Sequence, residues 1–405
     1  MPVTVVLIAA WGCDRGSEIP PVLGRDSAGI SIVENSQAAL DAAPVWVVDT
    51  IPAIDIGGDP EDEDQLFVRV VRARRTSEGS IWIADAGATQ IRGFDREGGL
   101  IHRLGRKGEG PGEFTRLADL LVVNDTIMAL DSGLRRISVW STTGKLLDTR
   151  TLGGGRVVPF APLQRAGDGS LWIEWMDEPP YSLTQDGRAP FGSAVRSSST
   201  ILRYGPEDGV GAPLGTFPGY EEAVWTREGR PLMSAAPLAR SLVFGVHDDR
   251  VYLGTQETYE IETWSTDGRR LRLIRGPAVD LTVTEAQVQD WAASAASTYP
   301  DPDPARRAEL AQFLSEPPHP RTGPAYGSLL IDPQGSVWVS EPTWARLPPA
   351  PSWTIYDPDG AVRATIRLPE GFRVFEIGDD YVLGLWTDEL GVEHVREHHL
   401  TRGTQ

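Results

Sequence analysis

The chain carries, at Gly79–Asp85, the segment GSIWIAD, in which turn residues are followed by alternating apolar side chains around a central tryptophan. Close copies of this pattern stand at Gly169–Trp175 and Gly335–Glu341. The looser copies stand at Asp125–Asp131, Asp249–Gly254 and Asp379–Gly384. A strand pattern that returns in this way, at intervals of about 40 to 90 residues, indicates a repeat architecture.

A second hairpin signal follows the copies. After the first copy, the apolar run Ile91–Asp95 leads into the turn Arg96–Gly99. Comparable glycine-containing turns stand at Thr142–Lys145, Thr266–Arg269 and Pro358–Ala361. A short turn of this kind between alternating apolar runs is a strong local cue for a hairpin. Each repeat therefore predicts a four-stranded antiparallel meander.

A single meander leaves both faces of its sheet exposed, whereas a radial stack of meanders buries those faces. The repeats thus predict an all-β fold, a six-bladed β-propeller of four-stranded antiparallel blades. The central aromatic residues Trp82, Trp172 and Trp338 are expected to fill the gaps between neighbouring blades, because aromatic side chains bury large areas. Stacking of these rings on a ligand is the alternative role.

The sequence also predicts how the ring closes. The frame Leu104–Phe114, which follows the first blade, is matched near the N-terminus by the frame Ile56–Phe67. Ile54–Ile56 therefore looks like an outer strand without a blade of its own, while the last repeat, which ends near Leu400, lacks an outer strand. Pairing of the two would join the chain ends and remove two sheet edges.

Part of this pattern resembles a known repeat family. The segment Leu104–Phe114 is similar to the signature that links successive NHL repeats, and Ala84–Phe94 and Leu130–Trp140 resemble the body of that repeat. The whole of Ile30–Leu400 resembles six-bladed propeller lipoproteins of environmental bacteria. This resemblance implies a fold and an envelope location, and it implies no agreed activity.

The N-terminus carries the one cysteine of the chain, Cys13, just after the apolar run Val3–Trp11. Small residues next to it, Ala10 and Gly12, are of the kind that a signal peptidase accepts. The segment resembles the end of a bacterial lipoprotein signal, which implies that Cys13 is lipidated and anchors the protein in the cell envelope. The alternative is an apolar N-terminus with an incidental thiol. One cysteine excludes a disulfide framework within the chain.

We therefore divide the chain into a signal segment at 1–13, a linker at 14–44 and the propeller at 45–402. The formal net charge of −19 argues against nucleic acid as a partner, because such a surface repels phosphates. No other segment approaches the ~20 apolar residues of a membrane span, so membrane contact is expected through the lipid anchor only. A monomer is expected.

Two kinds of insertion are expected to interrupt the meanders. Glu178–Thr200 and Pro218–Pro237 are rich in Pro, Gly and Ser and are predicted to be surface loops. A helical insertion is predicted at about 282–316, between blades four and five, with Thr284 capping one helix and Asp303 opening a second. This helical hairpin could be a lid over the channel mouth or a packed decoration without a ligand role.

Acidic residues recur after the central strand of the repeats. Asp85, Asp131 and Glu341 share one position, and Glu174 stands one place earlier. If the blades superpose, these side chains gather at one end of the ring, where they could bind a ligand or hold a cation such as calcium. The alternative is that each Asp caps its own turn by accepting nearby backbone N–H groups. No cofactor is predicted, with calcium left as an alternative.

No catalytic residue stands out, because the sequence holds no nucleophile elbow, P-loop or dinucleotide fingerprint. The first functional hypothesis is an envelope-anchored binding or scaffolding module that uses its loop face and central channel. Its partner could be a small molecule, a peptide, a glycan or a protein. The alternative, by analogy of fold, is a metal-dependent hydrolase or lyase of the six-bladed propeller type. Converging metal ligands in the channel would favour the enzyme.

Overall fold

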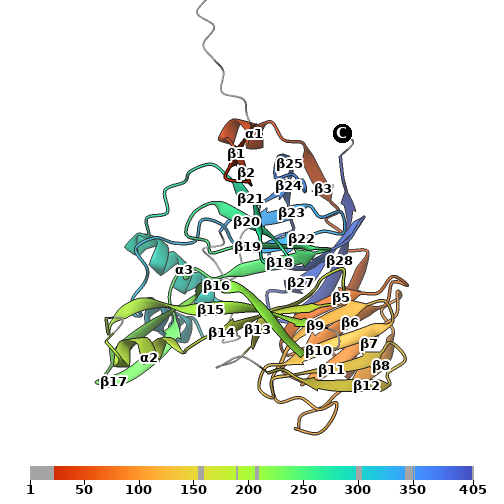
Figure 1. The fold of residues 1–405 in the computed structure, drawn as a ribbon. Coiled ribbons are helices and arrows are strands. Elements are labelled where there is room, and N and C mark those ends of the chain that lie inside the picture. Colours follow the sequence, from red (N-terminus) through yellow and green to blue (C-terminus); the bar gives the residue numbers. More distant parts are fainter. Residues whose placement is uncertain are drawn as a thin grey trace, which may run out of the picture.

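The computed structural model of the chain describes residues 22–153, 159–187, 190–205, 209–297, 303–342, 350 and 352–403. Its strands form successive blades around a common axis (Figure 1). The four strands of blade one are β5 (Val70–Arg75), β6 (Ile81–Asp85), β7 (Gln90–Phe94) and β8 (Leu100–Leu104). Those of blade two are β9 (Leu117–Val123), β10 (Thr126–Asp131), β11 (Arg136–Ser141) and β12 (Leu146–Thr151). Both are antiparallel meanders, as the repeats predict.

Blade three is larger than predicted. Its five strands are β13 (Pro159–Arg165), β14 (Leu171–Met176), β15 (Ser193–Gly205), β16 (Gly209–Arg227) and β17 (Arg230–Ala235). The prediction of surface loops at Glu178–Thr200 and Pro218–Pro237 is therefore largely wrong. Among the described residues of these two stretches, the short helix α2 (Pro180–Gln185) and its flanks interrupt the sheet, while the paired strands β15, β16 and β17 hold most of the others. Alternate residues along much of β15 are buried, which a sequence rich in Ser conceals.

Blade four carries an unexpected addition at its outer edge. Its own strands are β18 (Val243–His247), β19 (Arg250–Gly254), β20 (Glu260–Ser265) and β21 (Arg270–Arg275). Outside them, β2 (Ile30–Asn35) runs parallel to β21, and β1 (Val22–Ser27) pairs with β2 (Figure 1). The short helix α1 (Gln37–Asp41) follows. The predicted linker at 14–44 thus contains an edge hairpin and a helix in its described part.

Blades five and six are joined at the closure of the ring. Blade five consists of β22 (Leu329–Ile331), β23 (Val337–Ser340), β24 (Ser352–Tyr356) and β25 (Val362–Arg367). Blade six consists of β26 (Phe372–Ile377), β27 (Tyr381–Thr387), β28 (Glu393–Thr401) and the N-terminal β4 (Ile54–Ile56). Val395 of β28 pairs with Ile56, and Glu397 pairs with Ile54. The predicted closing strand is confirmed.

A second N-terminal strand strengthens this closure. β3 (Val45–Val48) runs parallel to β25 of blade five and antiparallel to the end of β28 in blade six. It therefore bridges the two blades through backbone hydrogen bonds. The 3-10 turn η1 (Glu63–Gln65) then leads from β4 into blade one.

The apolar core lies between neighbouring blades. Trp82 is fully buried and packs with Leu120 of the next blade. The equivalent residues Trp172 and Trp338 are 1% and 0% exposed, and each packs against the inner strands of the blade that follows. The core role predicted for the three tryptophans is confirmed, and the all-β six-bladed architecture with it.

The helical insertion consists of α3 (Glu285–Ser297) and α4 (Pro304–Ser315). Val288 of α3 is buried against Leu238, and Phe313 of α4 contacts Trp225 of β16 at 6.3 Å between ring centroids. The hairpin thus packs on the extension of blade three, α3 against the residues that follow β17 and α4 against β16. Within the described ranges, no helix is long and apolar enough to cross a membrane.

Candidate functional site

A cavity of about 550 Å³ lies where the innermost strands of blades one, three, four, five and six approach one another. Much of its lining is apolar and comes from β22, β26 and the start of β18. Leu242, Val243, Leu330, Ile331 and Phe375 are among these residues. None of the described residues that line the cavity belongs to α3 or α4.

One wall of the cavity carries three arginines. Arg72 and Arg74 extend from β5, and Arg373 extends from β26 of the neighbouring blade. The guanidinium carbons of Arg72 and Arg373 lie 5.6 and 5.0 Å from the centroid of the Phe375 ring. Cationic groups at this distance are attracted to an aromatic face. Two of the three arginines therefore lie against the same aromatic ring.

Each of the three arginines also forms a hydrogen bond with another residue. Arg74 Nη1 donates to the backbone oxygen of Phe375 at 2.5 Å and lies 3.7 Å from a carboxylate oxygen of Glu376. Arg373 Nη2 donates to the backbone oxygen of Val70 at 2.8 Å. The Nε of Arg74 is buried and has no hydrogen-bond partner in the described part of the chain. Burial, and then the charge of Arg72, lower the pKa of Arg74.

Two acids beside the arginines tie the innermost strands together. The Asp119 carboxylate is fully buried and accepts from Arg72 Nε and from the backbone N–H of Leu163, both at 2.6 Å. Glu376 accepts from the backbone N–H of Arg75 at 3.2 Å. An innermost strand has no further strand toward the axis, so its backbone groups need such partners. These contacts fix the wall on which the arginines stand.

Glu174 contributes an acid to the cavity from within β14. It is 6% exposed, and this burial raises its pKa to about 7, against the opposing effects of a hydrogen bond to Ser199 and the charge of Arg196. A carboxyl group with this pKa is divided between its acid and its carboxylate near neutral pH. Glu174 can therefore either donate or accept a hydrogen bond in the cavity.

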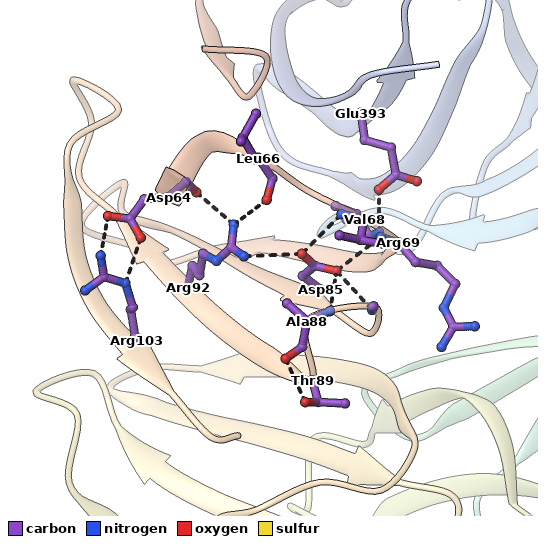
Figure 2. A network of polar contacts seen from close by, with 12 residues as sticks. Asp64, Leu66, Val68, Arg69, Asp85, Ala88, Thr89, Arg92, Arg103 and Glu393 are labelled. Carbon is purple, nitrogen blue, oxygen red and sulfur yellow. Dashed lines mark hydrogen bonds and ion pairs between the residues drawn. The ribbon is translucent and has the colours of Figure 1, made fainter. Parts of the chain in front are cut away.

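Asp85 stands in a different environment from Glu174 (Figure 2). Its buried carboxylate accepts the backbone N–H groups of Val68 and Arg69, which precede β5, at 3.3 and 3.1 Å. It also accepts those of Gly87 and Ala88, which follow β6, at 3.0 and 3.2 Å. The side chain thus binds the loop that enters blade one to the turn after its second strand.

The network around Asp85 extends outward through Arg92, which lies 3.4 Å from it and also donates to the backbone oxygens of Asp64 and Leu66 (Figure 2). Asp131 repeats the arrangement in blade two. It accepts the backbone N–H groups of Thr115, Arg116, Gly133 and Leu134 at 2.8 to 3.2 Å. These contacts are those expected of turn-capping aspartates.

The four predicted acids are therefore not brought together around the channel. Of the four, only Glu174 is among the described residues that line the cavity, while Glu341 is exposed beyond the end of β23. Cys13 lies outside the described residues. Within those residues, no group of three or more His, Cys, Asp or Glu side chains is placed to hold a metal ion.

The arginine wall was missed by the sequence reasoning, which followed the second strand of each repeat. A signal was present, because the segment Arg72–Arg75 holds three arginines in four residues of a strongly acidic chain. The sequence does not show that Arg72 and Arg74 share a wall with Arg373. Arg373 is about 300 residues away in the chain and joins them only because the ring closes.

Comparisons with known proteins agree with this architecture. Residues 62–165 match the model of a family described as a 6-bladed beta-propeller, a match that covers less than half of the chain. No curated protein matches the chain.

Several solved structures are similar in shape at low sequence identity. A protein of Bacteroides fragilis, provisionally described as exported, is 12% identical, with 92% of this chain and 100% of that chain covered at a TM-score of 0.49. An inactive virginiamycin B lyase from Staphylococcus aureus with quinupristin is 11% identical, with 88% and 100% covered and a TM-score of 0.42. A gluconolactonase from Xanthomonas campestris is 14% identical, with 88% and 98% covered and a TM-score of 0.39. From its own blades and from the family match over 62–165, the chain is a six-bladed β-propeller.

Proposed function

We propose that this propeller is a binding module of the cell envelope and that its axial cavity is the ligand site. The observation that carries the proposal is the cavity of about 550 Å³ between the innermost strands. Ligand pockets typically measure about 300 to 1,000 Å³ and combine an apolar lining with a few converging polar groups. This cavity has both features, with Arg72, Arg74, Arg373 and Glu174 as its charged groups together with Glu376.

The walls of the cavity are held in place by contacts between blades. Asp119 links blade two to Arg72 and to Leu163, and Glu376 links blade six to blade one. The strands β3 and β4 close the ring behind these contacts. A cavity held in this way loses little conformational freedom when a ligand enters, which favours binding.

The charge of the side chains that line the cavity favours a binding module over a metal-dependent hydrolase or lyase. Three of the charged side chains that line the cavity are arginines. Guanidinium groups repel a divalent cation, whereas calcium and magnesium prefer sets of oxygen ligands. The proposal therefore places an organic ligand rather than a metal centre among these residues.

The envelope location is supported by the sequence. Cys13 follows an apolar run that resembles a lipoprotein signal. Labelling of cells with radioactive palmitate should mark the full chain, and Cys13→Ser should abolish the label. If the wild-type protein stays unlabelled, the lipid-anchor hypothesis is wrong. The proposal that the cavity binds a ligand does not depend on this result.

A blocked variant tests the cavity. Gln164 lines it from β13, and Gln164→Trp should fill part of its volume. Gln289→Trp, on the exposed side of α3, is the matched control. Thermal-shift assays would use organic anions, neutral sugars, short peptides and divalent metals, because a ligand that binds the folded state raises its apparent stability.

We expect at least one of these classes to raise the melting temperature of the wild type and of Gln289→Trp, but not of Gln164→Trp. Circular dichroism would show that the blocked variant is folded. The proposal fails if no class binds, or if Gln164→Trp responds as the wild type does.

A further inference from the structure

We propose that the cavity binds an organic anion with one carboxylate-type head group and an apolar body, and that Arg72, Arg74 and Arg373 receive the head group. This inference rests on the proposed function and adds the chemical class of the ligand. It follows from three features of the cavity, which are its charge, its unsatisfied donor and its apolar lining.

The charge of the lining is unequal. Among the described residues that line the cavity, three arginines face two glutamates, Glu174 and Glu376. Burial raises the pKa of Glu174 to about 7, so near neutral pH this residue carries only part of a negative charge. With Asp119, which pairs with Arg72 behind this wall, three arginines stand against three acids, so the part of its charge that Glu174 lacks leaves a small positive excess, although the whole chain has a formal net charge of −19. A low-dielectric cleft lined by one sign of charge concentrates ligands of the opposite sign.

The hydrogen bonding of Arg74 is incomplete. Its Nη1 donates to Phe375, but its buried Nε has no partner in the part of the chain that the structure describes. A buried donor without a partner destabilises the folded state. Because this Nε is out of reach of solvent, the Arg74 side chain must turn toward the cavity before a carboxylate can accept from Nε and a second guanidinium nitrogen together, a geometry that arginine favours. Such an anion would also reduce the repulsion between Arg74 and Arg72 that lowers the pKa of Arg74.

The remaining lining determines what the rest of the ligand is like. Leu242, Val243, Leu330 and Ile331 come from blades four and five and provide an apolar surface away from the arginines. Glu376 stands beside Arg74 at 3.7 Å, so it would repel a second negative charge there. The cavity therefore favours one anionic head and an apolar body over a polyanion.

Three probes of equal length separate charge from shape. Octanoate has the proposed head and body, octanol has the body alone, and octylammonium carries the opposite charge. Isothermal titration calorimetry of the full chain should show that octanoate binds at least about tenfold more tightly than octanol or octylammonium. This difference in affinity corresponds to about 1.4 kcal/mol. Its affinity should fall between about 0.1 and 1 M NaCl, because salt screens the guanidinium charges.

Variants assign this affinity to the arginine wall. Arg74→Met should weaken octanoate binding at least about tenfold and leave octanol unchanged. Lys107→Met removes an equal charge from an exposed loop and should have no effect. If Arg74→Met does not fold, Arg74→Lys keeps the charge without the planar fork, and it should still weaken octanoate binding.

The outcomes distinguish this inference from the proposal on which it rests. If octanol binds as tightly as octanoate and Arg74→Met changes neither, the cavity is a ligand site but not an anion site. If none of the probes binds while the broader screen finds another ligand in the cavity, the inference is again overturned and the proposed function stands. If nothing binds in the cavity in either experiment, both are wrong.

Discussion

Arg72 Nε donates a hydrogen bond of 2.6 Å to the carboxylate of Asp119 and thereby joins blade one to blade two inside the ring. The same carboxylate accepts the backbone N–H of Leu163 in blade three. One buried acid thus links three blades and holds a guanidinium group of the cavity in position.

We expect Asp119→Ala to lower the free energy of unfolding by about 3 to 5 kcal/mol, because it leaves the buried charge of Arg72 without its partner. Urea denaturation measures the change. Asp148→Ala is the matched control, since Asp148 pairs with Arg150 at a surface where both side chains are about half exposed. That change should cost less than about 1 kcal/mol. Equal losses in the two variants would contradict the linking role of Asp119.

The closing strand offers a second test. Ile56 of β4 is fully buried between blades one and six, whereas Ile51, a few residues earlier, is 80% exposed. Ile56→Ala should lower the free energy of unfolding by about 2 to 5 kcal/mol, and Ile51→Ala should change it by less than about 0.5 kcal/mol. A small effect at Ile56 would show that β4 does not stabilise the ring.

The role of Asp85 can be tested with and without calcium. Its carboxylate accepts four backbone N–H groups, so Asp85→Ala should lower the free energy of unfolding by at least about 3 kcal/mol in buffer with EDTA. Asp95, which accepts two N–H groups in the turn after β7, should cost about 1 to 2 kcal/mol when changed to Ala. If the loss at Asp85 occurs only when calcium is present, the residue is a metal ligand instead.

The stability of the protein should depend on pH through Glu174. Its folded-state pKa of about 7 lies above the ordinary 4.5, so the folded protein holds this proton more tightly. The resulting stability is complete below about pH 4.5 and is lost as the pH rises through 7. Between about pH 5 and 8, wild type should lose about 2.5 kcal/mol relative to Glu174→Gln. The exposed control Glu97→Gln should follow the wild type, and identical curves for all three proteins would contradict the shift.

The sequence predicted the parts of the fold that repeat. Because the frame Leu104–Phe114 recurs at Ile56–Phe67, the closing strand Ile54–Ile56 could be found, and the register of β4 with β28 agrees. The strand β2, outside the four strands of blade four, has no counterpart in the other repeats and was assigned to a linker. Its place is set by pairing with β21, about 240 residues further along the chain, which local patterns do not record.

The candidate site was harder to predict, for a physical reason. Asp85 and Asp131 recur because their role is tied to the turn, so the pattern points to them even though they cap backbone groups. The cavity instead depends on residues that break the pattern. β-Bulges at Val71 and Phe375 each add one residue to an innermost strand, and both residues line the cavity. A bulge redirects a side chain without leaving a clear trace in the sequence.

A crystal structure of the protein soaked with octanoate tests the central claim most directly. The account predicts electron density in the cavity, with the carboxylate within hydrogen-bond distance of Arg74 and the alkyl chain along Leu330 and Ile331. An empty cavity at saturating octanoate, or density only on the outside of the ring, would contradict it.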